Sequence, residues 1–453
     1  MICPFISGVD TVHAIATAQW ALEIAEKWAS RTGVSFSAEK TVAMFFNRGQ
    51  LRPGKNLVMN GRALEWSRES KYLGIIIDDQ LSFRQHINNK IAAAKLKLML
   101  LKNVFCNSWG PCPQQTLWAY TGIVRPALTY GSIVWAEAAQ TETFKEQFRK
   151  LQRLALIQVA HVRKSTPTAA LELLYGTPPL EIYLREMAVK AAVRIGIMPD
   201  WKVLDTKGHQ HLLYEHVPSE AKNSPLDDNI SDVIWQQNYE VDISDGKDIK
   251  WRDWVCYTDG SKVGVRSGWG GTIMANRRSY KKFCTIAYSM GSSSVFQAEV
   301  SAILTAAKIL WQNGVQDAEI DFMVDSQAGL KSLKNPLISS RLVKETKEKL
   351  NQLGSINDVT LHWIEAHKGH KFNEIADKFA NKGNASNRLG GLTCPNKRSI
   401  FSTIEAKARE DWTLKWDEEP GCRQSRFFIQ VPSKTRSKEL HRVSDIRSTV
   451  LSW

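Results

Sequence analysis

The amino-acid sequence predicts an α/β domain over residues 251–386, in which a mixed five-stranded sheet is flanked by helices. Three observations predict this fold. Short apolar or alternating segments typical of strands lie at 254–258, 268–275, 281–289, 320–324 and 359–364. Helical spacing of apolar residues appears at about 295–313, in two segments that run to Leu353, and at about 372–381. Turn residues at 276–279 and Gly314 separate these elements.

Four acidic residues occupy matching places on this predicted scaffold. Asp259 ends the first strand and Asp325 ends the fourth, while Glu299 lies in the first two turns of the first helix and Asp377 lies in the last helix. We expect the four side chains to converge at one edge of the sheet. Clustered carboxylates repel one another unless a cation compensates, so the pattern predicts a magnesium site. Two Mg²⁺ ions about 4 Å apart, with Mn²⁺ as a substitute, would support phosphodiester hydrolysis without a covalent intermediate.

A histidine is expected to assist this chemistry. His367 precedes Asp377 by ten residues and lies in the loop Ala366–His370. Its imidazole would carry a proton to the leaving group or help product release, because histidine titrates near neutral pH. Taken singly, each of these residues is an ordinary turn, cap, first-turn or loop residue. Their joint order and context favour a catalytic site.

Composition limits the classes of protein to which the chain can belong. Its 453 residues leave room for several globular domains, and a net charge of +14 favours a polyanionic partner. The seven cysteines are odd in number and lack a C-x-x-C pair, so reduced thiols in an intracellular protein are expected. No apolar run approaches the roughly 18 residues of a membrane span, and no membrane association is expected.

The region before residue 251 divides into three parts. Residues 1–83 suggest a helix at 10–30, a β-like stretch at 35–46 and a hairpin at 56–77. Residues 84–216 are helical, and between 84 and 164 they carry 12 Lys and Arg against three acids, which indicates either a nucleic-acid-binding face or an ordinary solvated surface.

The third part before residue 251 differs in charge from the segment that follows residue 386. Residues 217–250 hold two prolines and eight acids against three lysines, which predicts an acidic linker. Residues 387–453 form a basic tail without a catalytic pattern.

The motifs of residues 251–386 resemble the type 1 ribonuclease H signature. They are Tyr257–Ser261, Phe296–Glu299, Val324–Gln327, Trp363–His367 and Asn373–Asp377, in that order. The resemblance implies that Asp259, Glu299, Asp325 and Asp377 bind two metal ions, that His367 is mobile, and that the domain is an endonuclease for the RNA strand of RNA·DNA hybrids.

Two departures from the signature stand out. Val295 and Phe296 occupy the place where cellular members commonly carry asparagines that contact the RNA 2′-hydroxyls. Ala366 replaces the usual glycine before the histidine. Neither change touches an expected metal ligand.

The first 200 residues resemble the back half of a non-LTR retrotransposon reverse transcriptase. The segments that carry the resemblance are Lys40–Phe46, Tyr72–Gly74, Thr166–Ala170 and Gly176–Pro179. They imply a partial palm at 1–83 and a thumb and connection at 84–216, whose basic helices would then hold a nucleic-acid duplex. A nuclear location is implied by the family alone.

Polymerase activity is not expected. In that family the catalytic hairpin lies before the point where this sequence begins, and Asp78-Asp79 match the turn after the Tyr-Leu-Gly strand. The alternative function is a catalytically silent nucleic-acid-binding remnant of a retroelement.

Overall fold

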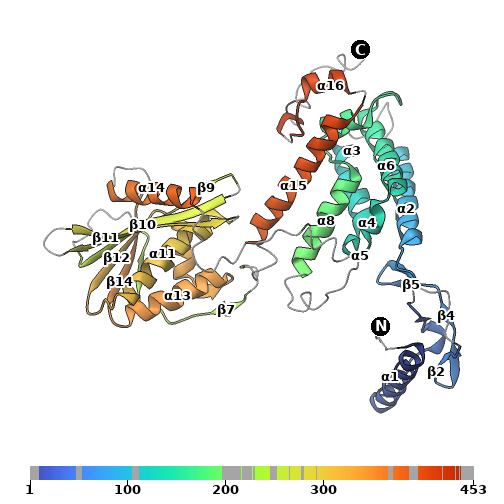
Figure 1. Ribbon diagram of the computed structural model, residues 1–453, viewed down its shortest axis with the longest axis horizontal. Helices are drawn as coiled ribbons and strands as arrows, with labels where there is room; N and C mark the ends of the chain where they lie inside the picture. The colour runs from blue at the N-terminus through green and yellow to red at the C-terminus, as the bar shows by residue number, and fades with distance from the viewer. Residues whose placement is uncertain are drawn as a thin grey trace. The chain divides into compact units, whose positions relative to one another are not determined.

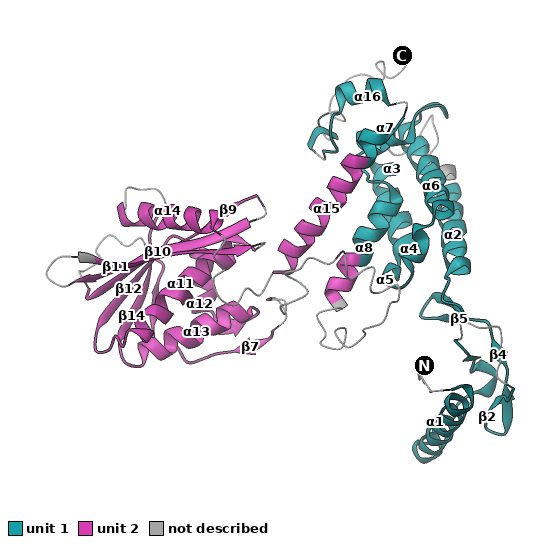
Figure 2. Ribbon diagram, viewed as in Figure 1, with its two compact units in different colours: residues 1–188, 415–453 teal, residues 189–414 magenta. Residues whose placement is uncertain are grey.

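The computed structural model describes residues 10–46, 54–104, 112–195, 216, 227, 230–244, 252–264, 266–276, 280–291, 293–365, 371–386, 396–420, 422–433, 435–437 and 439. The chain divides into two compact units, residues 1–188 with 415–453 and residues 189–414 (Figure 2). Among the described helices, none is both long and apolar enough to cross a bilayer. The described cysteines Cys112, Cys256, Cys284 and Cys422 are free thiols.

The second unit is built on a six-stranded mixed sheet. Its strands are β8 (Glu240–Asp242), β9 (Trp254–Val263), β10 (Arg266–Asn276), β11 (Tyr280–Gly291), β12 (Glu319–Val324) and β14 (Asp358–Trp363). They lie in the order β11-β10-β9-β12-β14-β8. The three strands β9, β10 and β11 pair antiparallel, whereas β9, β12, β14 and β8 pair parallel. The predicted mixed α/β sheet is confirmed, with one strand more than expected.

Helices cover both faces of this sheet (Figure 1). They are α11 (Val295–Gln312), α12 (Gln327–Lys334), α13 (Arg341–Gly354) and α14 (Lys371–Ala385). The helices α11 and α13 lie on one face and α14 lies on the other. The main core forms under α11, where Ile303, Ala307 and Leu310 are fully buried with Phe322 of β12. This burial explains why the apolar spacing in the sequence predicted the helix correctly.

The sixth strand comes from the segment predicted as an acidic linker. Within 217–250, β7 (Asp232–Val233) pairs antiparallel with β13 (Leu337–Ile338), and β8 pairs parallel with β14. Tyr239 is buried and its hydroxyl donates to the carbonyl of Leu333 at 2.8 Å. The described part of this segment is therefore folded onto the sheet. Strands of two and three residues that carry exposed acids leave no periodic apolar signal, which is why the sequence suggested a linker.

The N-terminal part of the first unit contains a helix and short strands. They are α1 (Thr11–Thr32), β1 (Ala43–Met44), β2 (Leu57–Met59), β3 (Arg62–Leu64), β4 (Trp66–Ser67), β5 (Glu69–Tyr72) and β6 (Ile75–Asp78). The helix and the turn at Asn60-Gly61 are confirmed, but the single hairpin predicted at 56–77 is two hairpins, β2–β3 and β5–β6. Leu73 and Gly74 both have positive φ and form the second turn.

Asp78 was predicted as a turn residue but is the last residue of β6, whereas Asp79 lies in the turn that follows, as predicted. Its carboxylate accepts hydrogen bonds from the backbone N–H groups of Ser82 at 2.9 Å and Phe83 at 2.6 Å. This Asx-type turn ends β6 and leads into the next helix. Asp78 therefore has a local structural role.

The rest of the first unit is helical. Its helices are α2 (Arg84–Val104), α3 (Pro113–Ala119), a π-helical turn (Tyr120–Val124), α4 (Arg125–Thr129), α5 (Ser132–Trp135), α6 (Glu142–Ala160), α7 (Thr168–Leu174) and α16 (Arg423–Phe428), while α8 (Leu180–Ile195) and α15 (Lys397–Glu418) contribute to both units. Arg125 is buried, and its guanidinium lies 3.7 Å from the ring centroid of Tyr183. This cation belongs to the core and is not part of a nucleic-acid-binding face. Trp412 and Trp416 in the predicted tail are also buried.

Candidate active site

Two of the predicted site residues meet where neighbouring parallel strands stop pairing. The register of β9 and β12 ends with Thr258 opposite Val324, and Asp259 and Asp325 are the next residues along the chain. The two carboxylates therefore lie at the same end of the parallel pair. Asp325 follows β12 directly, as predicted. Asp259 does not end its strand, because β9 continues to Val263 through antiparallel pairing with β10.

Glu299 approaches this point from the face of the sheet that α11 and α13 cover. It is the fifth residue of α11, and the close contact of helix and strand depends on Gly260. A Cβ atom at Gly260 would lie 2.6 Å from the backbone nitrogen of Glu299, which is closer than packing allows. The absent side chain thus lets α11 bring Glu299 against the strand that carries Asp259.

Asp377 approaches from the opposite face, on α14. This helix lies directly on β10, since a Cβ atom at Gly270 would be 2.1 Å from the nitrogen of Ala380 and one at Gly268 would be 2.2 Å from that of Asn384. The glycines of β10 set the depth at which α14 rests. That depth brings the charge of Asp377 within reach of Asp259.

The pKa of Asp259 is affected by the charges of the other three acids. Burial raises the pKa of Asp259 to about 8, and the charge of Asp325 contributes next, followed by the smaller effects of Asp377 and Glu299. A hydrogen bond from the backbone N–H of Gly260 at 2.6 Å opposes the rise. Carboxylates that hinder ionisation in this way form an acidic site that favours a compensating cation.

Ser326 forms a hydrogen bond with Glu299 that lowers the pKa of this carboxyl group. Burial raises the pKa of Glu299 and the charge of Asp325 adds to the rise, but a hydrogen bond from the hydroxyl of Ser326 opposes both. Ser326 is also the N-cap of α12, where its oxygen accepts from the backbone N–H of Gly329 at 3.1 Å. One hydroxyl thus fixes both the helix start and the carboxylate.

Two asparagines hold the other acids. Asn373 donates to Asp325 Oδ2 at 3.3 Å, and Asn381 donates to Asp377 Oδ1 at 2.9 Å. Asn381 in turn accepts from the hydroxyl of Ser261 on β9 at 2.6 Å. These contacts orient both carboxylates from α14 and β9.

No role was predicted for these two asparagines, although Asn373 begins one of the sequence motifs and the spacing of both residues held a signal. Asn373 and Asn381 stand four residues before and four residues after Asp377, so they share its side of the helix. Asn373 is 6% exposed, and its Oδ1 has no hydrogen-bond partner in the described part of the protein. Its buried amide therefore lies at the site with one acceptor still available.

The acidic group suits a hard divalent cation in its donor chemistry. Carboxylate oxygens are the ligands that Mg²⁺ and Mn²⁺ prefer, and a cation would relieve the repulsion that raises the pKa of Asp259. Among the described residues, no three His, Cys, Asp or Glu side chains already stand in a metal-binding arrangement. His367 lies outside the described residues, which resume at Lys371.

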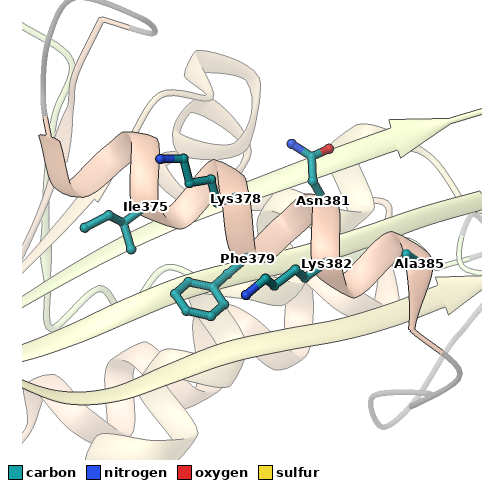
Figure 3. Close-up of a pocket in the computed structure, with 6 residues that line it drawn as sticks. All are labelled: Ile375, Lys378, Phe379, Asn381, Lys382 and Ala385. Atoms are coloured by element: carbon teal, nitrogen blue, oxygen red, sulfur yellow. The ribbon is translucent and has the colours of Figure 1, made fainter.

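Basic and aromatic side chains lie on α14, where Phe379 and Lys382 project from the same side of the helix (Figure 3). A pocket there is lined by Ile375, Lys378, Phe379, Asn381, Lys382 and Ala385. The ammonium groups of Lys282 and Lys382 lie 5.1 and 5.2 Å from the ring centroid of Phe379. Cations around an aromatic ring are suited to a nucleic-acid backbone and its bases.

Comparison with known proteins identifies similarities to this part of the chain and beyond it. Residues 252–385 match the family model described as RNase H. Curated relatives include the RNA-directed DNA polymerase from mobile element jockey of Drosophila melanogaster, which is 30% identical over 40% of this chain and 19% of its own length. A retrovirus-related Pol polyprotein from type-1 retrotransposable element R1 of Bradysia coprophila is 26% identical over 39% of this chain and 18% of its own length.

Two similar solved structures are matched over nearly their whole length. The solution structure of the PFV RNase H domain has 20% identity and a TM-score of 0.26, and the match covers 30% of this chain and 96% of that domain. The crystal structure of RNase H1 from the archaeon Halobacterium salinarum has 20% identity and a TM-score of 0.24, and the match covers 29% of this chain and 96% of that chain. The matches to curated relatives take in between 17% and 49% of their lengths.

Proposed function

We propose, from the premise that residues 252–385 are the ribonuclease H domain of a chain homologous to R1 and jockey retrotransposon polyproteins, that this protein hydrolyses the RNA strand of RNA·DNA hybrids. A region similar to reverse transcriptase precedes the domain. The observation that carries the proposal is the placement of Asp259 and Asp325 at the same end of the paired strands β9 and β12, with the backbone of Glu299 packed directly on Gly260. Burial and the charges of the other three acids raise the pKa of Asp259, as expected for such a group. An acidic cluster whose members hinder ionisation is costly for structure alone and suited to metal-assisted phosphoryl chemistry.

Each residue of the site has a proposed part in this reaction. Asp259, Glu299, Asp325 and Asp377 would hold two Mg²⁺ ions, with Mn²⁺ as a substitute, which supply an activated water and charge stabilisation at the leaving oxygen. Ser326 keeps Glu299 oriented and favours its ionised form. Asn373 and Asn381 orient Asp325 and Asp377. We propose His367 as the group that passes a proton to the leaving 3′-oxygen.

Each compact unit, taken by itself, carries a basic surface suited to nucleic acid. The first is the group formed by Lys282, Phe379 and Lys382 at α14 and β11. The second is on the helical region 84–164, where burial and the charges of Lys97 and Lys71 lower the pKa of Lys90. Cations that hinder one another's protonation form a surface that a phosphate backbone would relieve.

The proposal is tested with the full chain and three labelled duplexes, RNA·DNA, RNA·RNA and DNA·DNA, with and without Mg²⁺. We expect cleavage of the RNA strand of the hybrid alone, dependent on the metal and lost in Asp325→Asn. Equal cleavage of the RNA duplex would refute the specificity. Cleavage that persists in Asp325→Asn would place the activity in a contaminant.

A catalytically silent nucleic-acid-binding remnant is the second candidate. It is favoured by the ammonium groups of Lys282 and Lys382 around the Phe379 ring, because binding of nucleic acid through such a group needs no metal. Such a protein would bind the hybrid with strong salt dependence and leave it intact at every metal concentration. The division into a partial palm, a thumb and connection, and a basic tail, and a nuclear location, are further proposals that follow from the retroelement relatives.

A further inference from the structure

Asp227 lies outside the segment matched by the nuclease family, yet its side chain is buried in the nuclease unit. It is 2% exposed, and the family match begins only at residue 252. Its carboxylate accepts hydrogen bonds from three groups, the side chain of Gln297 and the side chain and backbone at the start of α13. A buried acid with three donors from two separate helices is a specific connection between them.

The first of these helices is α11, which carries Glu299. Gln297 donates its Nε2 hydrogen to Asp227 Oδ2 at 2.9 Å. Its Oε1 accepts from the backbone N–H of the N-cap Ser294 at 3.3 Å, as the second half of a capping box. Gln297 is fully buried, so both its Nε2 and its Oε1 depend on these protein partners for hydrogen bonds. Glu299 follows two residues later on the same helical turn.

The second helix is α13. Its N-cap Ser340 donates to Asp227 Oδ1 at 2.9 Å, and the backbone N–H of Leu342 donates to the same oxygen at 3.0 Å. The first turn of α13 contains no acid of its own. Asp227 therefore supplies the negative charge that a helix N-terminus favours, from a residue 113 positions earlier in the chain.

We propose that Asp227 is a positioning residue of the nuclease, which fixes the start of α11 against the start of α13 and so holds Glu299 in place for the metal. This inference rests on the proposed function. It extends the catalytic unit back beyond residue 252, to a carboxylate that touches neither substrate nor metal. Loss of such supporting contacts typically weakens metal binding by about tenfold or more.

The hydrogen-bond pattern allows a reciprocal test. In Asp227→Asn the new amide faces the amide of Gln297 donor to donor, and Gln297 cannot rotate without losing Ser294. In Gln297→Glu two carboxylates face each other in a buried position. In the double variant Asp227→Asn/Gln297→Glu, the asparagine donates to one oxygen of Glu and Ser294 donates to the other. In this variant the carboxylate is at position 297 and the amide is at position 227, so the pairing of donor and acceptor is kept.

The experiment measures two quantities on the full chain and on these three variants. The first is hydrogen exchange of the backbone amides in peptides covering 295–303 and 341–347. The second is the Mg²⁺ concentration that gives half-maximal hybrid cleavage. We expect each single variant to speed exchange at 295–303 by about tenfold and to raise the Mg²⁺ requirement by about tenfold. The double variant should recover most of both losses.

The matched control is Asp232→Asn. Asp232 lies on β7 in the same segment and forms an ion pair with Lys344 of α13 at 2.6 Å, but its side chain is 42% exposed, whereas Asp227 is buried. Asp232→Asn should leave exchange at 295–303 and the Mg²⁺ requirement unchanged. Unchanged hydrogen exchange at 295–303 in Asp227→Asn would overturn the inference. It would also be overturned if the double variant exchanged as fast as the single variants, or folded no better than they do. Because exchange needs no cleavage, it decides the role of Asp227 even if the wild-type chain cuts no hybrid, a result that would overturn the proposed function alone.

Discussion

Ser326 donates its hydroxyl hydrogen to Glu299 Oε2, although 27 residues separate them in the chain. Ser326 follows Asp325 directly in the chain, and Glu299 lies on the preceding helix, α11. The residue that supports Glu299 is therefore the sequence neighbour of another predicted metal ligand, Asp325. It also lowers the pKa of Glu299 against the effects of burial and of Asp325.

Removing this hydroxyl should move the pH dependence of cleavage. In Ser326→Ala the pKa of Glu299 rises, because the hydrogen bond from Ser326 that opposes the rise is removed, and the acid limb of the pH–rate profile shifts to higher pH. The missing N-cap of α12 should also cost about 1 kcal/mol of stability. Initial rates across a pH series measure the shift. Ser332→Ala is the control, since the Ser332 hydroxyl donates to the carbonyl of Gly329 within α12 at 2.7 Å, and an equal shift there would contradict the assignment.

Asp325→Asn should stabilise the metal-free protein while abolishing cleavage. The charge of Asp325 raises the pKa of both Asp259 and Glu299, so a neutral side chain removes repulsion that the folded state otherwise bears. Thermal unfolding in a chelator at mildly alkaline pH should show a higher melting temperature than the wild type. Asp317→Asn is the control, because Asp317 is exposed and has a positive φ that asparagine also adopts. A lower melting temperature for Asp325→Asn would show that the acids do not repel one another.

The stability of the metal-free protein should fall as pH rises between about 4 and about 8. The pKa of Asp259 is about 8 in the folded protein, against about 3.9 for an aspartate in an unfolded chain, so in this window the folded state binds a proton that the unfolded chain has lost. The contribution is complete below about pH 4 and lost above about pH 8. Unfolding measured across this range should show a shallower slope for Asp259→Asn. Added Mg²⁺ should stabilise the wild type most at the alkaline end, where no proton competes, and a stabilisation independent of pH would contradict the site.

Asn381→Ala should weaken metal binding more than it weakens folding. Asn381 is exposed, but it connects Asp377 to Ser261 of β9, and without it the Asp377 carboxylate loses its orientation. We expect the Mg²⁺ concentration for half-maximal cleavage to rise by about tenfold. A metal titration of cleavage rates measures this. Asn313→Ala, which removes an exposed side chain bonded to the carbonyl of Ile309 at 2.7 Å, should leave the titration unchanged.

Charge reversal at Lys71 and Lys97 should weaken hybrid binding. Both charges act on Lys90, so Lys71→Glu/Lys97→Glu raises the pKa of Lys90 and replaces part of a cationic group with acids. The slope of log affinity against log salt should become shallower by about 0.9 for each phosphate that the variant no longer neutralises. Binding measured at several salt concentrations tests this. Lys407→Glu on α15, where the lysine is 62% exposed, is the control, and equal weakening there would mean a general charge effect.

The main elements of the nuclease unit were predictable because its strands and helices carry clear apolar periods. The length of β9 was not predictable, because Asp259, Gly260 and Ser261 are typical of a turn and belong to the strand through pairing with β10. The places of Asp325, Glu299 and Asp377 on their elements were predictable, whereas their part in a metal site remains a prediction. Asp227 was not predictable, because its partners lie 70 and 113 residues away and no local pattern announces them.

The edge strand β8 has a practical consequence for anyone who prepares the nuclease unit alone. It pairs with β14 from Thr360 to His362, and so occupies hydrogen-bonding groups that would otherwise face water. A fragment begun at residue 252 would leave this row of backbone N–H and C=O groups bare. Unpaired edge strands form hydrogen bonds with strands of other molecules, so such a fragment should aggregate. A fragment that retains residues 227–244 should not aggregate.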